Sequence, residues 1–261
     1  MHRIVVALAL AACSQPASHR DDVRAQPRAA PTSGVSGDAR AEVNNPIADV
    51  IRDAPVADTP VDAVPLAIVD APMTWSAERE RLTLAYRRTH TDPAAADLAI
   101  EPRVIVLHYT GGHSAAATRA YFDRVTIEPG RRQLARGGKV NVSAHFVIDR
   151  DGTIYRLQPV TRYARHCIGL DHIAIGIENV GDGERYPLTA AQVAANAALV
   201  RQLAGQFRIT HLLGHHEVMQ FRDHPYFVER VASYHNVKAD PGAAFMASVR
   251  ERVADLGLAG L

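Results

Sequence analysis

The stretch Ala144-His-Phe-Val-Ile-Asp-Arg-Asp-Gly-Thr-Ile-Tyr-Arg-Leu157 decides the fold class. It contains two short apolar runs, residues 144–149 and 153–157, which are separated by Arg150-Asp151-Gly152. An Asp-Gly pair supplies the positive φ angles that a tight hairpin turn requires. The pattern therefore predicts two antiparallel strands that are joined by this turn.

Further apolar runs on both sides of the hairpin suit buried strands. Arg103–Tyr109 precedes it, and Ile173–Glu178 follows it as a predicted central strand that ends on a carboxylate. Ile209–Leu213 is a third run of the same kind. These runs predict a sheet that extends well beyond the hairpin.

Helical patterns occupy the segments between these strands. The clearest covers Leu188 to Phe207, because Thr189 and Gln192 form a capping box at its start and apolar residues recur along one face. Other predicted helices cover residues 76–88, 115–124 and 241–256. Because strands and helices interleave, we expect an α/β fold with a central mixed β-sheet flanked by helices.

Composition divides the chain near residue 73. Eight of the fifteen prolines fall before Met73, whereas Trp75, all eight tyrosines and all six phenylalanines lie beyond it. This contrast predicts a disordered tether over residues 13–72 and one folded domain over residues 73–261. The 261 residues carry a net charge of only +1, so we expect no nucleic-acid partner. No obligate protein partner is evident.

The first residues have the layout of a secretion signal. A basic Met1-His-Arg3 precedes an apolar run, Ile4–Ala12, that is too short to span a bilayer. Leu10-Ala-Ala-Cys13 resembles the lipobox of bacterial lipoproteins, which implies removal of residues 1–12 and acylation of Cys13. Ser14 after the cysteine favours the periplasmic face of the outer membrane. An ordinary signal peptide is the alternative.

Histidines point to metal chemistry in the folded part. Ten of the thirteen lie between His108 and His235. His108 ends a predicted strand, His215 follows another, and Asp240 precedes Pro241, which favours an extended backbone. Two imidazoles and one carboxylate would leave a fourth zinc position open, the arrangement of a catalytic zinc site.

Two further residues suit hydrolysis at such a site. Glu178, at the end of a central strand, is the candidate base that takes a proton from water and returns it to the leaving nitrogen. Lys238 shares a face with Asp240 in an extended segment, because the two residues are two positions apart. Its fixed positive charge would hydrogen-bond a developing oxyanion.

Five segments together resemble the type 2 N-acetylmuramoyl-L-alanine amidase family, which also includes the peptidoglycan recognition proteins. The segments follow one another in order and at sensible spacing from about Arg103 to Gly242, and the resemblance extends more loosely from Thr74 to Arg250. They are Val104-Ile-Val-Leu-His-Tyr-Thr110, Val142-Ser-Ala-His-Phe-Val-Ile-Asp-Arg-Asp-Gly152, Ala174-Ile-Gly-Ile-Glu-Asn-Val-Gly181, Leu213-Gly-His215 and Lys238-Ala-Asp-Pro-Gly242.

The resemblance implies a mixed sheet, one zinc ion, and hydrolysis of the amide between N-acetylmuramic acid and L-alanine in peptidoglycan or its fragments. It places the zinc ligands on His108, His215 and Asp240, with Lys238 as the catalytic lysine. The family's acid/base is a tyrosine or a glutamate. Ala144 stands at the tyrosine position here, so the glutamate version applies. Asp240 replaces a cysteine of some members, and zinc should still bind it.

Other side chains in matching segments are candidates for substrate contacts. Thr110 and Asn179 are expected to line the cleft, and His166 with Arg165 is a candidate to touch substrate. We interpret His145 as a structural group or one that supports a ligand.

Several alternatives stay open. His216 adjoins His215 and is the alternative ligand, and each ligand candidate taken alone would more often be structural. Cys167 beside His166 suggests a cysteine hydrolase, although no strand-to-helix nucleophile elbow surrounds it. A non-catalytic peptidoglycan-binding lipoprotein of the same fold is the main alternative function. A zinc peptidase that acts between amino acids shares the metal chemistry.

Overall fold

A computed structural model describes residues 66–261 of the chain. The predictions about residues 1–12, Cys13 and most of the tether lie outside the described residues. Within residues 66–261, no helix combines the length and the apolar character that crossing a bilayer requires.

Six strands of the described residues form one mixed sheet in the order β1-β4-β3-β5-β2-β6. The β3–β4 pair is antiparallel and the other four neighbouring pairs are parallel. Strand β5 therefore lies inside the sheet, as predicted. The strands are β1 (Ile68–Asp70), β2 (Val104–Tyr109), β3 (Phe146–Ile148), β4 (Ile154–Arg156), β5 (Ala174–Asn179) and β6 (His211–Gly214).

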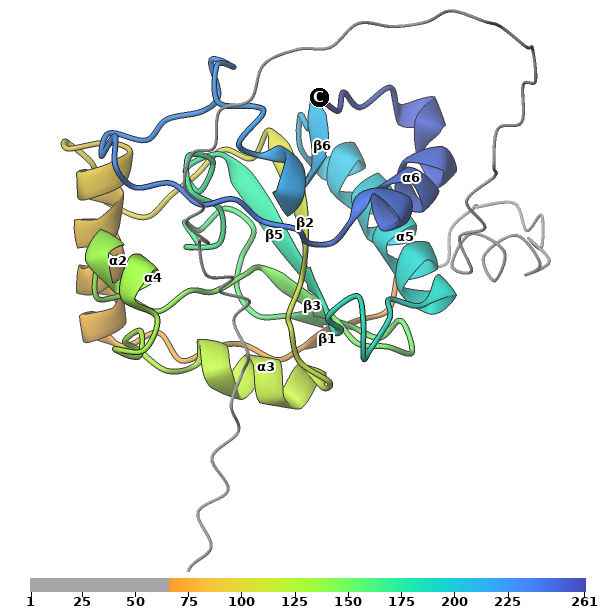
Figure 1. The fold of residues 1–261 in the computed structure, drawn as a ribbon, viewed down its shortest axis with the longest axis horizontal. Helices are drawn as coiled ribbons and strands as arrows, with labels where there is room; N and C mark the ends of the chain where they lie inside the picture. The colour runs from red at the N-terminus through yellow and green to blue at the C-terminus, as the bar shows by residue number, and fades with distance from the viewer. Residues whose placement is uncertain (1–65) are drawn as a thin grey trace, which may run out of the picture. The chain divides into compact units, whose positions relative to one another are not determined.

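Helices flank this sheet, and Figure 1 shows α5 and α6 side by side at one end of the view and α2 with α4 at the other. The predicted α/β fold is thus confirmed. The α-helices are α2 (Ala77–His90), α3 (Ala115–Phe122), α4 (Arg132–Gly137), α5 (Ala190–Gln206) and α6 (Ala243–Arg252). Two 3-10 helices, η1 (His215–Glu217) and η2 (Ala254–Leu256), follow β6 and α6.

Local sequence signals explain the clearest elements. The β3–β4 hairpin turns where the amide of Gly152 donates to the carbonyl of Asp149, and Gly152 has a φ of +89°. Helix α5 begins at the predicted capping box, with Thr189 accepting from the amide of Gln192 and the Gln192 side chain accepting from the amide of Thr189. Both signals are short-range, so they act without help from the rest of the chain.

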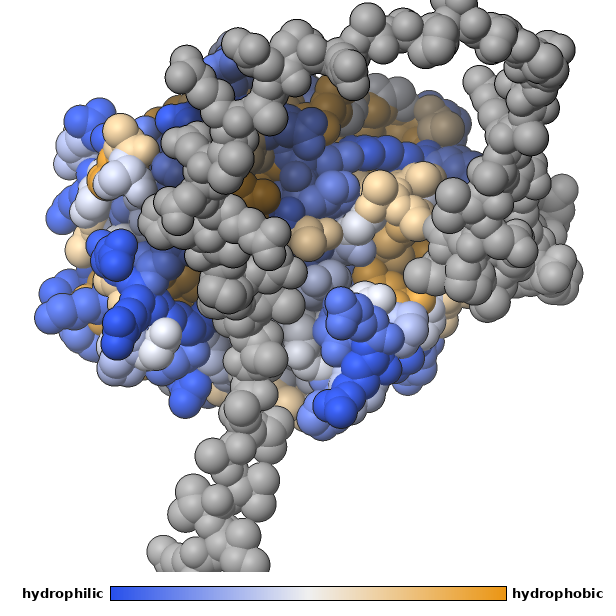
Figure 2. All heavy atoms as spheres, in the orientation of Figure 1, coloured by the Kyte–Doolittle hydropathy of each residue, from blue (hydrophilic) through white to orange (hydrophobic). Residues whose placement is uncertain are grey.

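The main hydrophobic core lies between the sheet and the α5–α6 pair. Ile105 and Leu107 of β2 and Ile175 and Ile177 of β5 are fully buried there. Figure 2 shows hydrophobic residues reaching the surface beside α5 and α6, whereas hydrophilic side chains cover the region of α2 and α4. The apolar side of the sheet is therefore closed by these two helices.

The folded part begins before residue 73, where the change in composition placed the boundary. Strand β1 pairs with β4, and the amides of Ala71 and Met73 donate to carbonyls at the end of β4. Asp70 also accepts from Arg156 at 2.7 Å. The tether prediction is thus wrong for residues 68–72. A three-residue edge strand has no detectable period, so composition alone could not reveal it.

Two other elements differ from the sequence prediction. The six-residue helix α4 was not among the predicted helices, because it is too short to show a helical period. The C-terminal helix was predicted over residues 241–256, but α6 ends at Arg252 and η2 follows.

Candidate metal centre

The central strands present two different faces. On β2, Ile105 and Leu107 point toward α5 and α6, so the alternation of side chains places His108 on the opposite face. Glu178 of β5 is the register partner of His108 and therefore lies on that same face. The site is built on the side of the sheet that α5 and α6 do not cover.

Three buried side chains bring their donor atoms together on this face. Nδ1 of His108 lies 2.8 Å from Nδ1 of His215 and 3.4 Å from Oδ2 of Asp240. Nδ1 of His215 lies 3.1 Å from the same Oδ2 atom. All three residues are at least nine-tenths buried. The sequence named these three as candidate ligands, and the structure places them together.

This donor set fits a zinc ion. Zinc binds imidazole nitrogen at about 2.0–2.1 Å and carboxylate oxygen at about 2.0–2.2 Å, so two ligands of a tetrahedral ion stand about 3.3–3.5 Å apart. The His108–Asp240 separation of 3.4 Å matches that edge length, and the other two separations, 2.8 and 3.1 Å, are shorter. A small outward shift of the side chains would admit the ion.

The charges of the cluster also suit a cation. Burial, together with the neighbouring His215, lowers the pKa of His108 to about 4, so its ring is neutral near pH 7. Burial opposes ionisation of Asp240, but the adjacent His215 and His108 imidazoles hold the pKa of its carboxyl group well below the usual value. The cluster thus offers a neutral imidazole and a carboxylate, which are the forms that bind metal.

The segment after β6 sets the positions of His215 and Asp240. The amide of His216 donates to the backbone carbonyl of Asp240 at 2.8 Å, which ties η1 to the loop before α6. Glu217 accepts from the amide of Gly214 and forms an ion pair with Arg250 of α6. Two separate parts of the chain are therefore joined directly behind the cluster.

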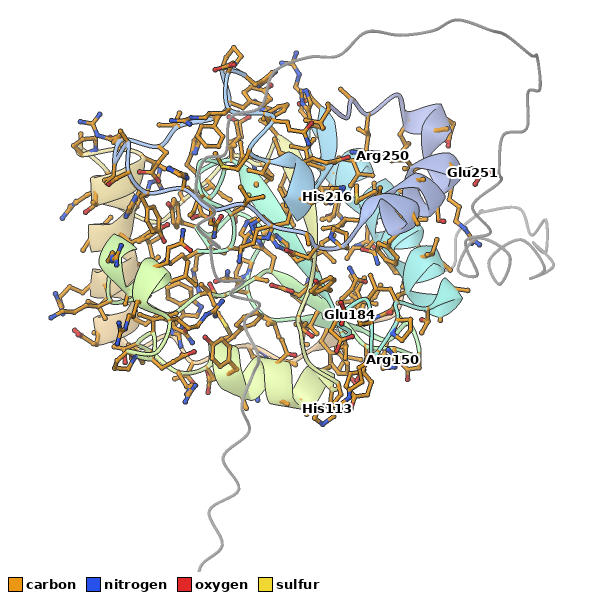
Figure 3. The ribbon with its side chains drawn as sticks, in the orientation of Figure 1. His113, Arg150, Glu184, His216, Arg250 and Glu251 are labelled. Carbon is orange, nitrogen blue, oxygen red and sulfur yellow. The ribbon has the colours of Figure 1, made fainter. Side chains whose placement is uncertain are left out.

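His216, the alternative ligand, is not part of the cluster. Its ring lies against the carbonyl of Asp240, with Nδ1 at 3.2 Å, and packs over Gly214. Figure 3 labels His216 on η1, near Arg250 of α6. Of the two adjacent histidines, His215 is the one whose side chain meets His108 and Asp240.

Glu178 and Lys238, the candidate catalytic pair, both influence this site electrostatically. Burial and then the negative charge of Asp240 raise the pKa of Glu178 well above its usual value, while Lys238 opposes that shift. The Oε2 atom of Glu178 is buried and finds no hydrogen-bond donor among residues 66–261. A buried carboxyl oxygen without a partner is costly and is often found where a group acts on substrate.

Asn179 does not line the cleft, contrary to the sequence prediction. It is fully buried on the α5 side of the sheet, where its side chain accepts from Asn196 at 2.7 Å and donates to the carbonyl of His108 at 3.1 Å. Side chains alternate along β5, so Asn179 must face away from its neighbour Glu178. Its role here is to join β2, β5 and α5.

Arg165 is likewise a structural residue. Its guanidinium group is buried and donates to the carbonyls of Leu134, Gly138 and Val140 and to the hydroxyl of Tyr234. These contacts engage both terminal nitrogens of the guanidinium group in holding the segment around α4. The proposed contact of Arg165 with substrate is therefore wrong.

Thr110 and His166 lie next to the site, but their polar atoms are engaged. The Thr110 hydroxyl accepts from the amides of Gly112 and Gly181, at 3.0 and 3.4 Å. Nδ1 of His166 lies 3.1 Å from Nε2 of His108, and its Nε2 contacts the carbonyl of Ala174 at 3.3 Å. Sequence reasoning placed His166 near substrate and missed this contact with a candidate ligand.

Cys167 is buried, and burial raises the pKa of its thiol well above the usual value. A nucleophilic cysteine needs the opposite shift, because the thiolate is the reactive form. The side chain packs with Val104 and Val106 in a small apolar cluster under the site. The geometry therefore favours the metal cluster over a cysteine nucleophile.

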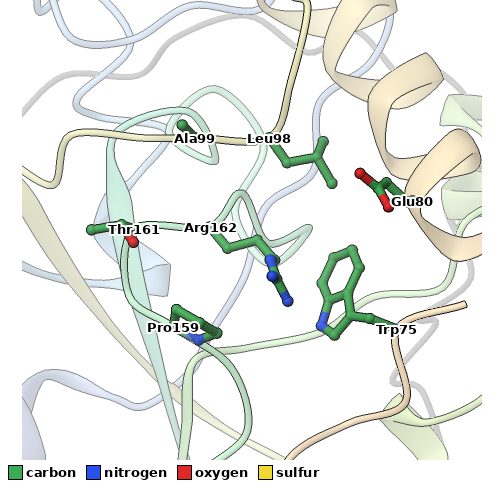
Figure 4. Close-up of a pocket in the computed structure, with 7 residues that line it drawn as sticks. All are labelled: Trp75, Glu80, Leu98, Ala99, Pro159, Thr161 and Arg162. Atoms are coloured by element: carbon green, nitrogen blue, oxygen red, sulfur yellow. The ribbon is translucent and has the colours of Figure 1, made fainter. Parts of the chain in front are cut away.

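Two surface cavities, of about 330 and 480 Å³, are lined by residues other than the candidate metal ligands. Figure 4 shows the smaller one, where the Arg162 guanidinium lies over the Trp75 ring at 4.5 Å from its centroid. The larger one lies between β1, β4 and α5. Neither cavity includes His108, His215 or Asp240, so donor chemistry rather than cavity size identifies the site.

Fold and site together define an α/β protein with a buried His-His-Asp cluster of the kind that metal-dependent hydrolases use. The family model for N-acetylmuramoyl-L-alanine amidase matches residues 98–243, which is more than half of the chain. The chain belongs to this family, as its sequence segments predicted. Membership supports amidase activity on peptidoglycan. No curated protein matches the chain.

Several solved structures are similar to the chain. The endolysin amidase LysCS from Clostridium intestinale is 23% identical and matches 74% of this chain and 97% of its own, with a TM-score of 0.46. An AmpD derivative is 23% identical over 71% of this chain and 94% of its own, with a TM-score of 0.45. Human PGRP-IBETAC, solved with glycosamyl muramyl pentapeptide, is 18% identical over 60% and 90%, with a TM-score of 0.40.

Proposed function

We propose that this protein is a zinc-dependent N-acetylmuramoyl-L-alanine amidase. Its substrate is the amide between the lactyl group of N-acetylmuramic acid and L-alanine, in peptidoglycan or its fragments. One observation carries the proposal: His108, His215 and Asp240 bring two imidazole nitrogens and a carboxylate oxygen, the kinds of donor that zinc binds, within 4.8 Å of one another. Membership in the amidase family supports the choice of bond.

Zinc held by these three side chains would supply a Lewis acid that polarises the scissile carbonyl and lowers the pKa of water. The protein's own groups perform the remaining tasks. Glu178 lies on the same face as His108 and carries a buried carboxyl oxygen that has no partner among residues 66–261. In our proposal it takes a proton from the attacking water and returns it to the L-alanine nitrogen as the amide bond breaks.

The raised pKa of Glu178 is compatible with this role. Part of the shift comes from the negative charge of Asp240. A cation held by Asp240 would offset this charge, and the positive charge of Lys238 already opposes the shift. Lys238 lies two residues before Asp240 and is half-buried. Its ammonium group is the candidate that stabilises the oxyanion as the carbonyl carbon becomes tetrahedral.

Digestion of defined muropeptides tests the activity. The purified protein is incubated with an N-acetylmuramoyl-pentapeptide fragment, with and without a chelator, and the products are weighed by mass spectrometry. We expect an intact sugar and a peptide with a free L-alanine amine, and we expect the chelator to abolish their release until zinc is restored.

Other products would contradict the proposal in different ways. Cleavage between two amino acids would indicate a zinc peptidase. Binding of the fragment without any release, in a sample shown to contain zinc, would indicate a peptidoglycan-binding protein of the same fold. Release that persists without metal would remove zinc from the mechanism.

We further propose that residues 1–12 are a signal peptide and that a lipid on Cys13 anchors the enzyme at the periplasmic face of the outer membrane. The proposal rests on the lipobox-like Leu10-Ala-Ala-Cys13 and on Ser14. An anchored domain would reach nearby cell wall through the residues before β1. Labelling with a radioactive fatty acid should mark the wild-type chain and not Cys13→Ser, and equal labelling of both would contradict the anchor.

A further inference from the structure

A second layer of histidines lies behind the candidate metal ligands. The ring of His166 stands edge-on to that of His108, with centroids 5.2 Å apart. The ring of His145 lies behind His166, with centroids 5.9 Å apart. Both His166 and His145 are outside the cluster that meets around Asp240. His166 contacts His108 directly, with Nδ1 at 3.1 Å from Nε2 of His108.

The direction of these hydrogen bonds follows from one fixed acceptor. The carbonyl of Ala174 can only accept, so Nε2 of His166, at 3.3 Å, must be its donor. In a neutral ring Nδ1 is then an acceptor, and it faces Nε2 of His108 at 3.1 Å. Nε2 of His108 therefore carries the hydrogen, which leaves a lone pair on the Nδ1 atom that faces Nδ1 of His215 at 2.8 Å.

The sheet is shaped to receive the His166 ring. A Cβ atom on Gly176 of β5 would stand 2.7–2.9 Å from three atoms of that ring, which no side chain could tolerate. The absence of a side chain at Gly176 lets His166 lie flat on the strand between Ala174 and Glu178. Any other residue at this position would push the ring off His108.

His145 holds the strand beneath His166. Its Nδ1 accepts from the amide of Gly176 at 2.9 Å, and its Nε2 donates to the carbonyl of Arg162 at 2.9 Å. The loop that carries His166 is fixed separately, because Asp171 accepts from the amides of His166 and Cys167 at 2.8 and 2.6 Å. Hydrogen bonds thus fix both the strand under the His166 ring and the loop that carries it.

We propose that His166 is a positioning residue that accepts the Nε2 hydrogen of His108 and so keeps the His108 Nδ1 lone pair directed at the metal position. This role rests on the proposed zinc site. A ligand imidazole that can take either tautomer or turn about its bond binds metal less tightly than one that is fixed. Loss of such a supporting contact lowers metal affinity by about 10–100-fold.

Two substitutions separate the hydrogen bond from the bulk of the ring. His166→Asn places a carbonyl oxygen near the position of Nδ1 and retains an acceptor for His108. His166→Leu fills similar space and offers none. His172→Leu is the matched control, because His172 is also a half-buried histidine of this loop and its Nδ1 has no hydrogen-bond partner among the described residues.

The experiment measures two quantities on the full-length protein. Imidazole ¹⁵N spectra of the metal-free wild type, at pH 7.5, report which His108 nitrogen carries hydrogen. Competition with a chromophoric chelator gives the zinc dissociation constant of each variant. We expect the Nε2–H tautomer at His108, zinc affinity near that of wild type for His166→Asn and His172→Leu, and about 10–100-fold weaker binding for His166→Leu.

Each outcome has a separate meaning. An Nδ1–H tautomer at His108 in the wild type would overturn the inference even if His166→Leu failed to fold. Equal zinc affinity of His166→Leu and wild type would overturn it as well. Failure of the wild type itself to bind zinc would instead refute the proposed function, so the two failures are distinguishable.

Discussion

The two faces of the central strands carry different kinds of side chain. Toward α5 and α6, Ile105, Leu107, Ile175 and Ile177 form a closed apolar layer in which each side chain is fully buried by its neighbours. On the other face, histidines and carboxyl groups lie close together, and Glu178 keeps a buried oxygen that has no hydrogen bond within the described part of the chain. The apolar face stabilises the fold. Burying the polar groups of the other face costs free energy, which the rest of the fold must offset.

Three consecutive residues of β5 show the contrast most directly. Ile177 packs in the main core, Glu178 faces the candidate metal centre, and Asn179 faces α5 again. Because side chains alternate along a strand, a shift of one residue changes a structural role into a chemical one. Substitutions along this strand should therefore separate activity from stability.

The largest effect is expected at Glu178. Glu178→Gln keeps the shape of the side chain and removes the base, so turnover should fall by roughly 10²–10⁴-fold while bound zinc is retained. Rates of muropeptide cleavage and zinc content of the same sample check both parts. Unchanged turnover would refute the assignment of the base.

Asn179→Ala, one residue away, is the matched control. It removes the contacts with Asn196 and with the carbonyl of His108, so we expect about 1–3 kcal/mol lower free energy of unfolding and little change in turnover per folded molecule. A loss of turnover as large as that of Glu178→Gln would mean that Asn179 takes part in catalysis, contrary to this assignment.

Ile177→Ala tests the apolar face. The side chain is fully buried among residues of the sheet and α5, and its truncation should lower the free energy of unfolding by about 2–5 kcal/mol. Denaturant unfolding gives the free energy, and activity is compared at equal folded fraction. A folded fraction with strongly reduced turnover would mean that the two faces are not independent.

Lowering the pH should lower the free energy of unfolding through His145. Burial lowers the pKa of His145 from 6.5 to about 4. Between these values the unfolded chain binds more protons than the folded chain, so the free energy of unfolding falls as the pH is lowered from 6.5 toward 4, by at most about 3 kcal/mol from this group. His145→Asn should show a shallower fall in urea unfolding at pH 7, 6 and 5. An identical pH dependence would contradict the assignment.

The smallest effect is expected at the edge of the apolar layer. Thr189 caps α5, and Thr189→Ala should lower the free energy of unfolding by about 1 kcal/mol, because the amide of Gln192 loses its acceptor. Thermal unfolding measures the change, and turnover should stay at the wild-type level. A change several times larger would mean that the contact of the Thr189 hydroxyl with the Arg150 carbonyl dominates.

Sequence signals predicted the elements that local chemistry determines. The hairpin at Gly152, the capped helix α5 and the apolar strand β2 all carry a turn, a cap or a run of side chains that acts within a few residues. Strand β1 was missed, because three residues at a sheet edge, two of them exposed, carry no such signal. Its position depends on backbone pairing with β4.

The candidate site was only partly accessible from the sequence. His108, His215 and Asp240 were named from strand ends and family segments, and the structure brings them together. Asn179 was misplaced although the alternation along β5 predicts its direction once Glu178 is assigned. The contact of His166 with His108 depends on the bare backbone of Gly176 and on the loop fixed by Asp171, which join distant parts of the chain.

The central claim is that one zinc ion binds between His108, His215 and Asp240. X-ray absorption at the zinc edge, measured on the purified full-length protein and on Asp240→Ala, tests it most directly. We predict one zinc per wild-type chain with two imidazole nitrogens and oxygen ligands at about 2.0–2.2 Å, and weak, substoichiometric zinc in the variant. An unchanged zinc spectrum in Asp240→Ala, or a wild-type chain that takes up no zinc, would contradict the account.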